Sequence, residues 1–194
     1  MKGHDTLSYE KLISKNNGCL LKVTSQSFDS SKEVDYLIRY VTRSRENEKQ
    51  DLISYGGRGA DVRDDVSIAI KQWKAVQAAY TSPKRKFGRY CFHEIYCLTS
   101  EVSERIDEER LDDLAYELSE EYWKEGHQVI YGIHKPDQHE NRVHIHFAIN
   151  TVCFRTGKKW HDWFGTRKTR NERFDTITES FIDKSNLAEN SNML

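Results

Sequence analysis

The 194-residue sequence predicts an α/β fold. We expect a two-layer or three-layer sandwich, in which helices flank a central, largely antiparallel sheet of about five strands. Segments with strand-like and helix-like hydrophobic spacing follow one another along the chain with short connections. The segments 128–134 and 142–152 are adjacent strands with a spacing that suits a hairpin, which favours antiparallel pairing. The length suits one domain at 18–185, with a flexible segment at 1–17 and a tail at 186–194.

The N-terminal half is expected to alternate strands and helices. Residues 19–24 read as the first strand. Ser30 followed three residues later by Glu33 forms a capping-box pattern, which predicts the start of a helix. That helix has one apolar stripe, made by Val34, Leu37, Ile38 and Val41. A short strand is expected at 52–55, ended by a glycine pair, and a second helix at 64–80.

In the C-terminal half, residues 89–98 are expected to form a strand whose side chains alternate between two faces. Between Glu101 and Glu125 the sequence has eleven acidic and three basic residues, together with helical apolar spacing. This pattern predicts an amphipathic helix with an acidic outer face. A turn at Thr156-Gly157 and a last helix at about 168–183 complete the expected fold.

The composition indicates a polar-surfaced protein, because 37% of the residues are hydrophobic and 31% are charged. The sequence has neither an apolar stretch of membrane-spanning length nor the apolar core of a signal peptide, so we expect a cytoplasmic protein without membrane insertion. Residues 155–173 contain seven basic and two acidic residues. A basic face of this kind suits a polyanion, although ordinary solvated charge is the simpler interpretation.

The most informative stretch is His144-Ile145-His146 within a strand-like run. Side chains two apart on a strand share a face, so the two imidazoles project together. His134, at the end of the neighbouring predicted strand, supplies a third imidazole. Three imidazoles leave open positions on a bound metal, and they suit manganese, nickel, copper or zinc better than magnesium. The alternative is a set of structural histidines without a metal.

A nucleophile is available on the first helix, where Tyr36 and Tyr40 share a face. Three arginines, Arg39, Arg43 and Arg45, surround them, as expected for a phosphate-binding helix. A tyrosine beside a metal-bound phosphate can attack phosphorus when the negative charge is neutralised. Because a free tyrosine has a pKa near 10, Asp35 or His93 are candidates to assist. The alternative is that both rings only pack against the fold.

Two motifs resemble those of the plasmid relaxases, DNA nickases of the HUH endonuclease superfamily that start conjugation and mobilization. The first is Leu37-Ile38-Arg39-Tyr40-Val41-Thr42, and the second contains His134 and the run His144–Asn150. A tyrosine before the histidines favours a relaxase over other HUH enzymes, which usually have the opposite order. The resemblance covers roughly residues 20–182, and it implies that 18–185 is a single relaxase domain with the HUH-type palm fold.

The resemblance implies that Tyr40 is the nucleophile, with Tyr36 as the competing candidate. It implies that the metal ligands are His134, His144 and His146. The family usually has aspartate two residues after the first histidine, whereas Asp137 follows Lys135-Pro136 here. His139 therefore remains an alternative third ligand. Asp137 and Asn150 are expected to support the ligands from behind, and Asn150 matches the polar residue that closes the motif.

The implied reaction is a metal-dependent, site- and strand-specific nick of DNA at a transfer origin. It leaves a 5′-phosphotyrosyl link and a free 3′ hydroxyl, with manganese or magnesium in use and zinc or nickel as alternatives. The implied partners are single-stranded DNA, auxiliary relaxosome proteins and a coupling protein. DNA contacts are expected from Arg39, Arg43, Lys158, Lys159, Arg167, Lys168 and Arg170. Two alternatives stay open, a three-histidine hydrolase that uses activated water and an inactive DNA-binding relative of the fold.

Overall fold

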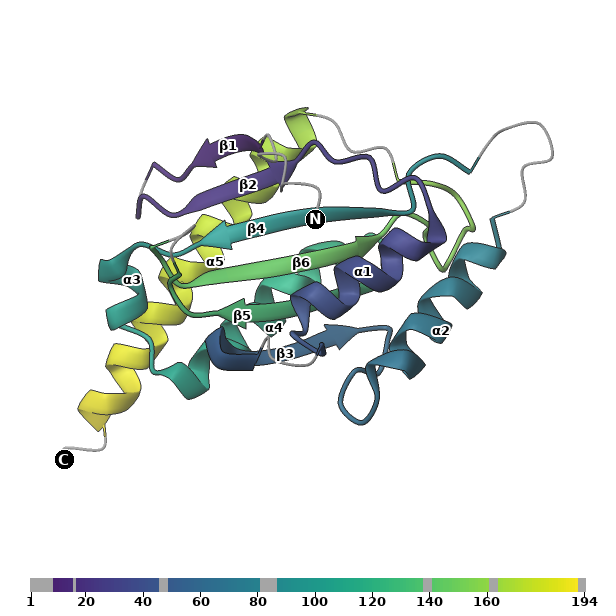
Figure 1. The fold of residues 1–194 in the computed structure, drawn as a ribbon. Coiled ribbons are helices and arrows are strands. Elements are labelled where there is room, and N and C mark those ends of the chain that lie inside the picture. Colours follow the sequence, from purple (N-terminus) through teal and green to yellow (C-terminus); the bar gives the residue numbers. More distant parts are fainter. Residues whose placement is uncertain are drawn as a thin grey trace.

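The computed structural model describes residues 9–15, 17–45, 49–80, 87–137, 141–160 and 164–191. In these residues a six-stranded sheet has the order β1-β2-β4-β6-β5-β3, with every neighbouring pair antiparallel (Figure 1). The strands are β1 (Tyr9–Ile13), β2 (Leu20–Thr24), β3 (Leu52–Arg58), β4 (Cys91–Cys97), β5 (Val129–His134) and β6 (His144–Asn150). The antiparallel sheet is as predicted, with one strand more than expected.

Helices cover both faces of the sheet, so the fold is a three-layer α/β sandwich (Figure 1). The helices are α1 (Ser31–Val41), α2 (Val66–Ala78), α3 (Ser100–Glu104), α4 (Glu108–Trp123) and α5 (Phe164–Ser191). Helices α1 and α2 pack on one face of the sheet and form one apolar core with it. Helices α4 and α5 pack on the opposite face and form a second apolar core. No helix among the described residues is long and apolar enough to cross a membrane.

The alternation of β6 determines which face carries the histidines. Ile145, Phe147 and Ile149 belong to the core beneath α4 and α5. His144 and His146 therefore project from the opposite face, toward α1. The alternation of apolar residues and histidines in the sequence predicted this separation of side chains between the two faces.

The N-terminal capping box of α1 is confirmed. The backbone N–H of Glu33 donates to the Ser30 hydroxyl, and the N–H of Ser30 donates to the Glu33 carboxylate at 2.8 Å. The four apolar side chains of the predicted stripe are all buried. These contacts hold α1 across β5 and β6, with its C-terminal end above the histidines.

Three expected boundaries were wrong. Residues 9–13, assigned to a flexible segment, form β1, which pairs with β2 and is tied to α5 by the hydrogen bond from Ser14 to Asp175. The expected acidic helix is divided into α3 and α4, because Asp107 begins a new helix. Helix α5 begins at Phe164 and continues to Ser191, through most of the expected tail.

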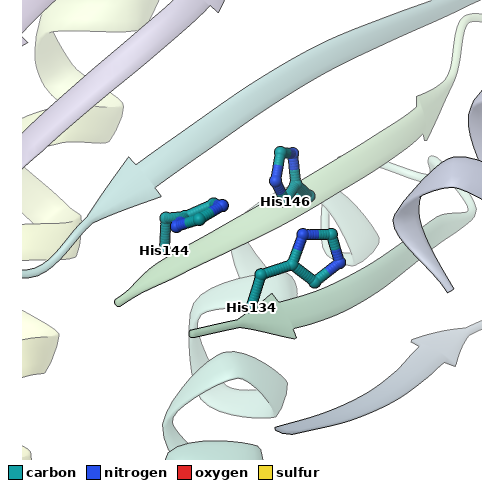
Figure 2. A group of neighbouring side chains, drawn as sticks. All are labelled: His134, His144 and His146. Atoms are coloured by element: carbon teal, nitrogen blue, oxygen red, sulfur yellow. The ribbon is translucent and has the colours of Figure 1, made fainter. Parts of the chain in front are cut away.

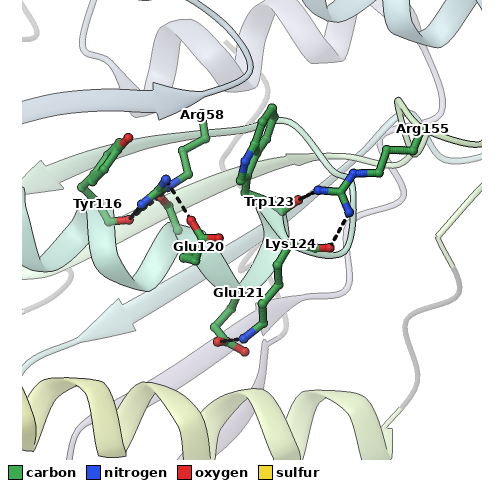
Figure 3. Close-up of polar contacts among 8 residues, drawn as sticks. Arg58, Tyr116, Glu120, Glu121, Trp123, Lys124 and Arg155 are labelled. Carbon is green, nitrogen blue, oxygen red and sulfur yellow. Dashed lines mark hydrogen bonds and ion pairs between the residues drawn. The ribbon is translucent and has the colours of Figure 1, made fainter.

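Two arginines from other elements bind α4, Arg58 at a carboxylate and a backbone carbonyl and Arg155 at backbone carbonyls (Figure 3). Arg58 of β3 lies 2.8 Å from the Glu120 carboxylate and donates to the backbone carbonyl of Tyr116. Arg155, in the hairpin after β6, donates to the carbonyl of Lys124 at 2.9 Å. A guanidinium at this position satisfies a carbonyl that the end of a helix leaves without an intrahelical partner. Arg155 therefore has a structural role in the fold.

Candidate metal and tyrosine site

Three histidines from two neighbouring strands form a buried cluster (Figure 2). His134 ends β5 and lies directly opposite His144 in the antiparallel register, and His146 is two residues further along β6. One ring nitrogen from each residue lies within 4.8 Å of the other two. Figure 2 shows the three rings gathered over β5 and β6. The structure thus brings together the three predicted ligands.

Backbone carbonyls determine which nitrogen of two of these rings faces inward. Nε2 of His134 donates to the carbonyl of Val41 at 2.9 Å, and Nδ1 of His144 donates to that of Arg142 at 2.8 Å. A carbonyl accepts only from a protonated nitrogen, so the lone pair of each ring is on the other nitrogen. Such contacts behind a metal ligand orient the ring and keep its lone pair available.

The cluster contains buried polar atoms that the described residues leave without a hydrogen bond. They are Nδ1 of His134 and Nε2 of His146. Leaving a buried polar atom unpaired costs roughly 1–3 kcal/mol, so such atoms are uncommon in stable folds. A divalent cation bound by three imidazole nitrogens would satisfy both atoms. The residues present therefore fit a metal.

The electrostatic environment keeps the rings of His134 and His146 neutral. Burial, followed by the charge of Arg43, lowers the pKa of His134 to about 4. Burial also lowers the pKa of His146 well below its usual value, and the neighbouring histidines add to this effect. Neutral imidazole is the state that binds a metal. At neutral pH these side chains need not release a proton to act as ligands.

Tyr40 is in ring contact with the cluster. Its ring centroid lies 5.3 Å from that of His146 and 6.1 Å from that of His134. Tyr36 is one turn earlier on α1, where it stacks on Tyr40 at 6.5 Å with 44% of its surface exposed. Tyr36 is covered by the guanidinium of Arg45, at 4.1 Å from its centroid. Only Tyr40, of these two rings, is in edge contact with the histidines.

Arg43 is the cation beside Tyr40. Its guanidinium lies 4.7 Å from the centroid of the Tyr40 ring and is held at 2.6 Å by the carboxylate of Asp51. Burial raises the pKa of Tyr40, and the Arg43 charge opposes that rise because it favours the phenolate. Arg43 was predicted to contact DNA. In the structure it is largely buried and acts on Tyr40 and Asp51.

His93 of β4 lies behind the cluster. Its Nε2 is 2.8 Å from Nδ1 of His146, and the two rings are stacked with centroids 5.1 Å apart. From the sequence, His93 was expected only to assist proton removal from Tyr40. The structure shows that it also orients His146. The sequence signal for this contact was the alternation of β4, which places His93 on the face of the sheet that α1 covers.

Asp137 and Asn150 were predicted to support the metal ligands, and the structure places Asn150 elsewhere. Asn150 is at the far end of β6, where its amide donates to the carbonyl of Trp73 and the side chain of Gln128. It holds α2 to the sheet and has no hydrogen bond to His134, His144 or His146, which corrects the prediction. Asp137 follows β5, and its charge contributes to the raised pKa of Tyr40. The alternative ligand His139 lies outside the described residues.

The predicted DNA-binding residues do not form one surface. Arg170 is buried and paired with Glu94 on the opposite side of the sheet, so its assignment to DNA was wrong. Arg39 donates to Ser67 of α2 at 3.2 Å. Lys158 and Lys168 are exposed, and Lys159 and Arg167 are partly exposed. The two residues on α5, Arg167 and Lys168, belong to the helix layer that covers the face away from the histidines.

Comparison with known protein families agrees with this site. Residues 40–181 match the family model "Relaxase: MobA/VirD2-like, nuclease domain". The match begins at Tyr40 and includes both strands that carry the histidines. A comparison with curated proteins finds no significant match. The matched region covers more than half of the sequence, and the chain belongs to the MobA/VirD2-like relaxases, a family of DNA-nicking enzymes.

Proposed function

We propose that this chain is a metal-dependent relaxase that nicks one DNA strand at a transfer origin, with Tyr40 as the nucleophile. The observation that carries the proposal is the contact between Tyr40 and a buried cluster of three histidines, in which Nδ1 of His134 and Nε2 of His146 have no hydrogen-bond partner among the described residues. The family assignment supports the same reaction class. Tyr36 is the less suitable candidate, because its ring is half-exposed and lies one turn from the cluster.

In this proposal His134, His144 and His146 hold a divalent cation, manganese or magnesium in use, with zinc and nickel as alternatives. Such a cation supplies charge neutralisation and polarisation to a phosphate beside it. The donor set favours manganese over magnesium, since imidazole suits the former better. His93 keeps the ring of His146 in position through their hydrogen bond.

The proposed step is a transesterification. The Tyr40 oxygen forms a bond to phosphorus, and the bond from phosphorus to the 3′ oxygen of the preceding nucleotide breaks. The phenol loses its proton and the leaving oxygen gains one, which gives a 5′-phosphotyrosyl link and a free 3′ hydroxyl. Arg43 stabilises the phenolate through its charge. Reversal of the same step rejoins the strand.

The substrate in this proposal is single-stranded DNA at a transfer origin of a plasmid or integrative element. Auxiliary relaxosome proteins would expose that strand, and a coupling protein would receive the covalent complex. Both partners belong to the proposed role in conjugation or mobilization. In this role the protein acts in the cytoplasm.

The direct test uses labelled single-stranded oligonucleotides from the transfer origin of the element that carries the gene, with manganese. The wild-type protein should form a covalent adduct, and the peptide that gains nucleotide mass should contain Tyr40. Tyr36→Phe serves as the matched control and should retain the adduct, whereas Tyr40→Phe should lose it. An adduct that persists in Tyr40→Phe would refute the nucleophile.

Metal dependence is tested in the same assay. Removal of divalent cations with a chelator should abolish the adduct, and manganese should restore it. An adduct that survives chelation would contradict the metal role. Cleaved oligonucleotide without any tyrosine adduct would instead support a three-histidine hydrolase, and DNA binding without cleavage would support an inactive relative.

A further inference from the structure

A hollow of about 620 Å³ lies at the end of the sheet where β6 finishes and β4 starts. One wall comes from Ala79 and Tyr80, just after α2, and another from Phe87, Arg89 and Phe92, before and at the start of β4. The third wall is the hairpin that follows β6. The hollow is separate from the histidine cluster, and none of the residues discussed above as ligands or nucleophile lines it.

Aromatic rings form much of the lining. Phe87 stacks against Tyr90 with centroids 4.0 Å apart, and Tyr80 meets Phe87 edge-on at 5.3 Å. On the other side, the ring of Phe92 is in edge contact with Trp160 at 5.0 Å. Tyr80, Phe87, Phe92 and Trp160 line the hollow, and aromatic rings that line a hollow can accept another planar group by stacking.

Cations lie against these rings. The ammonium of Lys159 is 3.6 Å from the centroid of Phe87 and donates to the Thr151 hydroxyl at 3.1 Å. The guanidinium of Arg89 lies 4.7 Å from the centroid of Phe92. Among the described residues that line the hollow, none is a carboxylate. Burial lowers the pKa of Lys159 to about 8, so an anion placed here would favour the charged form of this amine.

Strand β6 connects the candidate metal ligands to the hollow. β6 starts at His144 and ends at Asn150, and the next residue, Thr151, lines the hollow. At about 3.3 Å per residue, Thr151 is roughly 16 Å along the strand from His146. An extended DNA strand that starts at the histidine cluster covers this distance within a few nucleotides.

We propose that this hollow is a nucleobase subsite, which takes one unstacked base of the single-stranded DNA between its aromatic walls. Lys158, Lys159 and Arg89 then face the neighbouring phosphates. The subsite would contribute to sequence recognition at a position away from the scissile phosphate. The inference rests on the proposed action on single-stranded DNA, and it does not depend on which tyrosine is the nucleophile.

The test measures binding of a fluorescein-labelled twelve-nucleotide oligothymidylate by anisotropy, in chelator so that no cleavage occurs. Phe87→Ala should weaken binding roughly tenfold, since the loss of one stacked base typically lowers the affinity by about this factor. Phe87→Tyr keeps the ring and should keep the affinity. Tyr116→Ala is the matched control and should bind like wild type. It removes a half-exposed ring of α4 that packs against the guanidinium of Arg58 in β3.

A second probe separates stacking from charge attraction. A twelve-unit oligomer of abasic deoxyribose phosphate should bind the wild-type protein more weakly than oligothymidylate, and Phe87→Ala should not weaken it further. Equal affinity of the two probes for wild type, or unchanged oligothymidylate binding in Phe87→Ala, would overturn the proposal. Thermal melts of each variant show whether it has folded.

Photocrosslinking keeps the proposal testable if Phe87→Ala is unstable. An oligothymidylate with 4-thiothymidine at every position should crosslink to peptides that contain Tyr80, Phe87 or Trp160, and crosslinks only elsewhere would overturn the subsite. Failure here is distinguishable from failure of the nicking proposal. Unchanged oligothymidylate binding in Phe87→Ala overturns the subsite alone, and wild-type protein that forms no adduct with transfer-origin DNA overturns the nicking proposal alone.

Discussion

Gly132 of β5 lies directly beneath the backbone carbonyl of Val41, where a Cβ atom would overlap the carbonyl oxygen. The same oxygen accepts the hydrogen bond from His134, and Val41 follows Tyr40 in α1. A glycine at this one position therefore lets the end of α1 sit on the sheet. The contact holds a candidate ligand and the candidate nucleophile in one arrangement.

Replacement of this glycine should uncouple Tyr40 from the histidines. In Gly132→Ala the added methyl group must push the end of α1 away from β5, because the opposing atom is backbone and cannot rotate aside. We expect covalent adduct formation to fall at least about tenfold, since small misplacements of reacting groups have effects of this size. The rate of adduct formation at saturating DNA measures the effect.

Gly59→Ala is the control for a general loss of stability. Its left-handed backbone and the nearby Trp123 ring also disfavour a side chain, but it lies after β3, away from α1. This variant should have a lower melting temperature with near-normal adduct formation. If both variants lose activity in proportion to their melting temperatures, the positioning role of Gly132 is refuted.

His93 is expected to contribute to metal affinity without contacting the metal. Its ring nitrogen lies 2.8 Å from His146, and loss of such a partner typically weakens metal binding about 10- to 100-fold. Calorimetric titration of His93→Gln and His93→Phe with manganese measures this. The glutamine variant, which can still form a hydrogen bond, should retain more affinity than the phenylalanine variant.

Asn150→Ala provides the comparison on the same face of the sheet. Asn150 is as deeply buried as His93, but its hydrogen bonds go to Trp73 and Gln128. We expect lower stability and unchanged manganese affinity. Weaker manganese binding in this variant, or normal binding in His93→Phe, would contradict the assigned roles.

The parts of this site that depend on local spacing were predictable. Period-two alternation is a property of one strand, so the shared face of His144 and His146 follows from the sequence. The third ligand needed the register of β5 against β6, which pairs His134 with His144, ten positions later in the sequence. The hydrophobic pattern indicated two adjacent strands, and only the structure gives their register.

Contacts between distant segments were not predictable. Arg170 is in a basic run that looked like a DNA-binding surface, but its partner Glu94 is 76 residues away in the sequence. Charge counting along the chain cannot show which charges become paired in the interior. The same reason applies to Asn150, whose polar partners come from α2 and from the residue before β5.

The metal-free protein should lose stability in mild acid. His93 and His134 have pKa values lowered by burial to about 3 and about 4, compared with 6.5 when unfolded. Below pH 6.5 the unfolded chain binds protons that the folded protein does not, so stability falls as the pH decreases toward 4. At pH 5 this costs roughly 2 kcal/mol for each group.

Urea unfolding at pH 7 and pH 5 in chelator measures this loss. His93→Gln removes one of the groups with a lowered pKa, and its free energy of unfolding should fall less between the two pH values than that of wild type. An equal fall in both proteins would show that His93 is not a source of the acid sensitivity. Added manganese should raise the free energy of unfolding at pH 7, because a metal that binds only the folded state stabilises it.

Removal of Arg170 should destabilise the fold. Its guanidinium donates to the Glu94 carboxylate at 3.0 Å, and Tyr122 donates to the same carboxylate at 2.8 Å, all in the interior beneath α5. Arg170→Met leaves a buried carboxylate without its cation, which typically costs about 3–5 kcal/mol. The double variant Glu94→Gln with Arg170→Met should recover part of this loss, because no uncompensated charge remains.

Lys168→Met, on the exposed side of the same helix, should change the free energy of unfolding by less than about 0.5 kcal/mol. Urea denaturation of the four proteins tests the assignment, and an Arg170→Met variant as stable as wild type would show that the ion pair is dispensable.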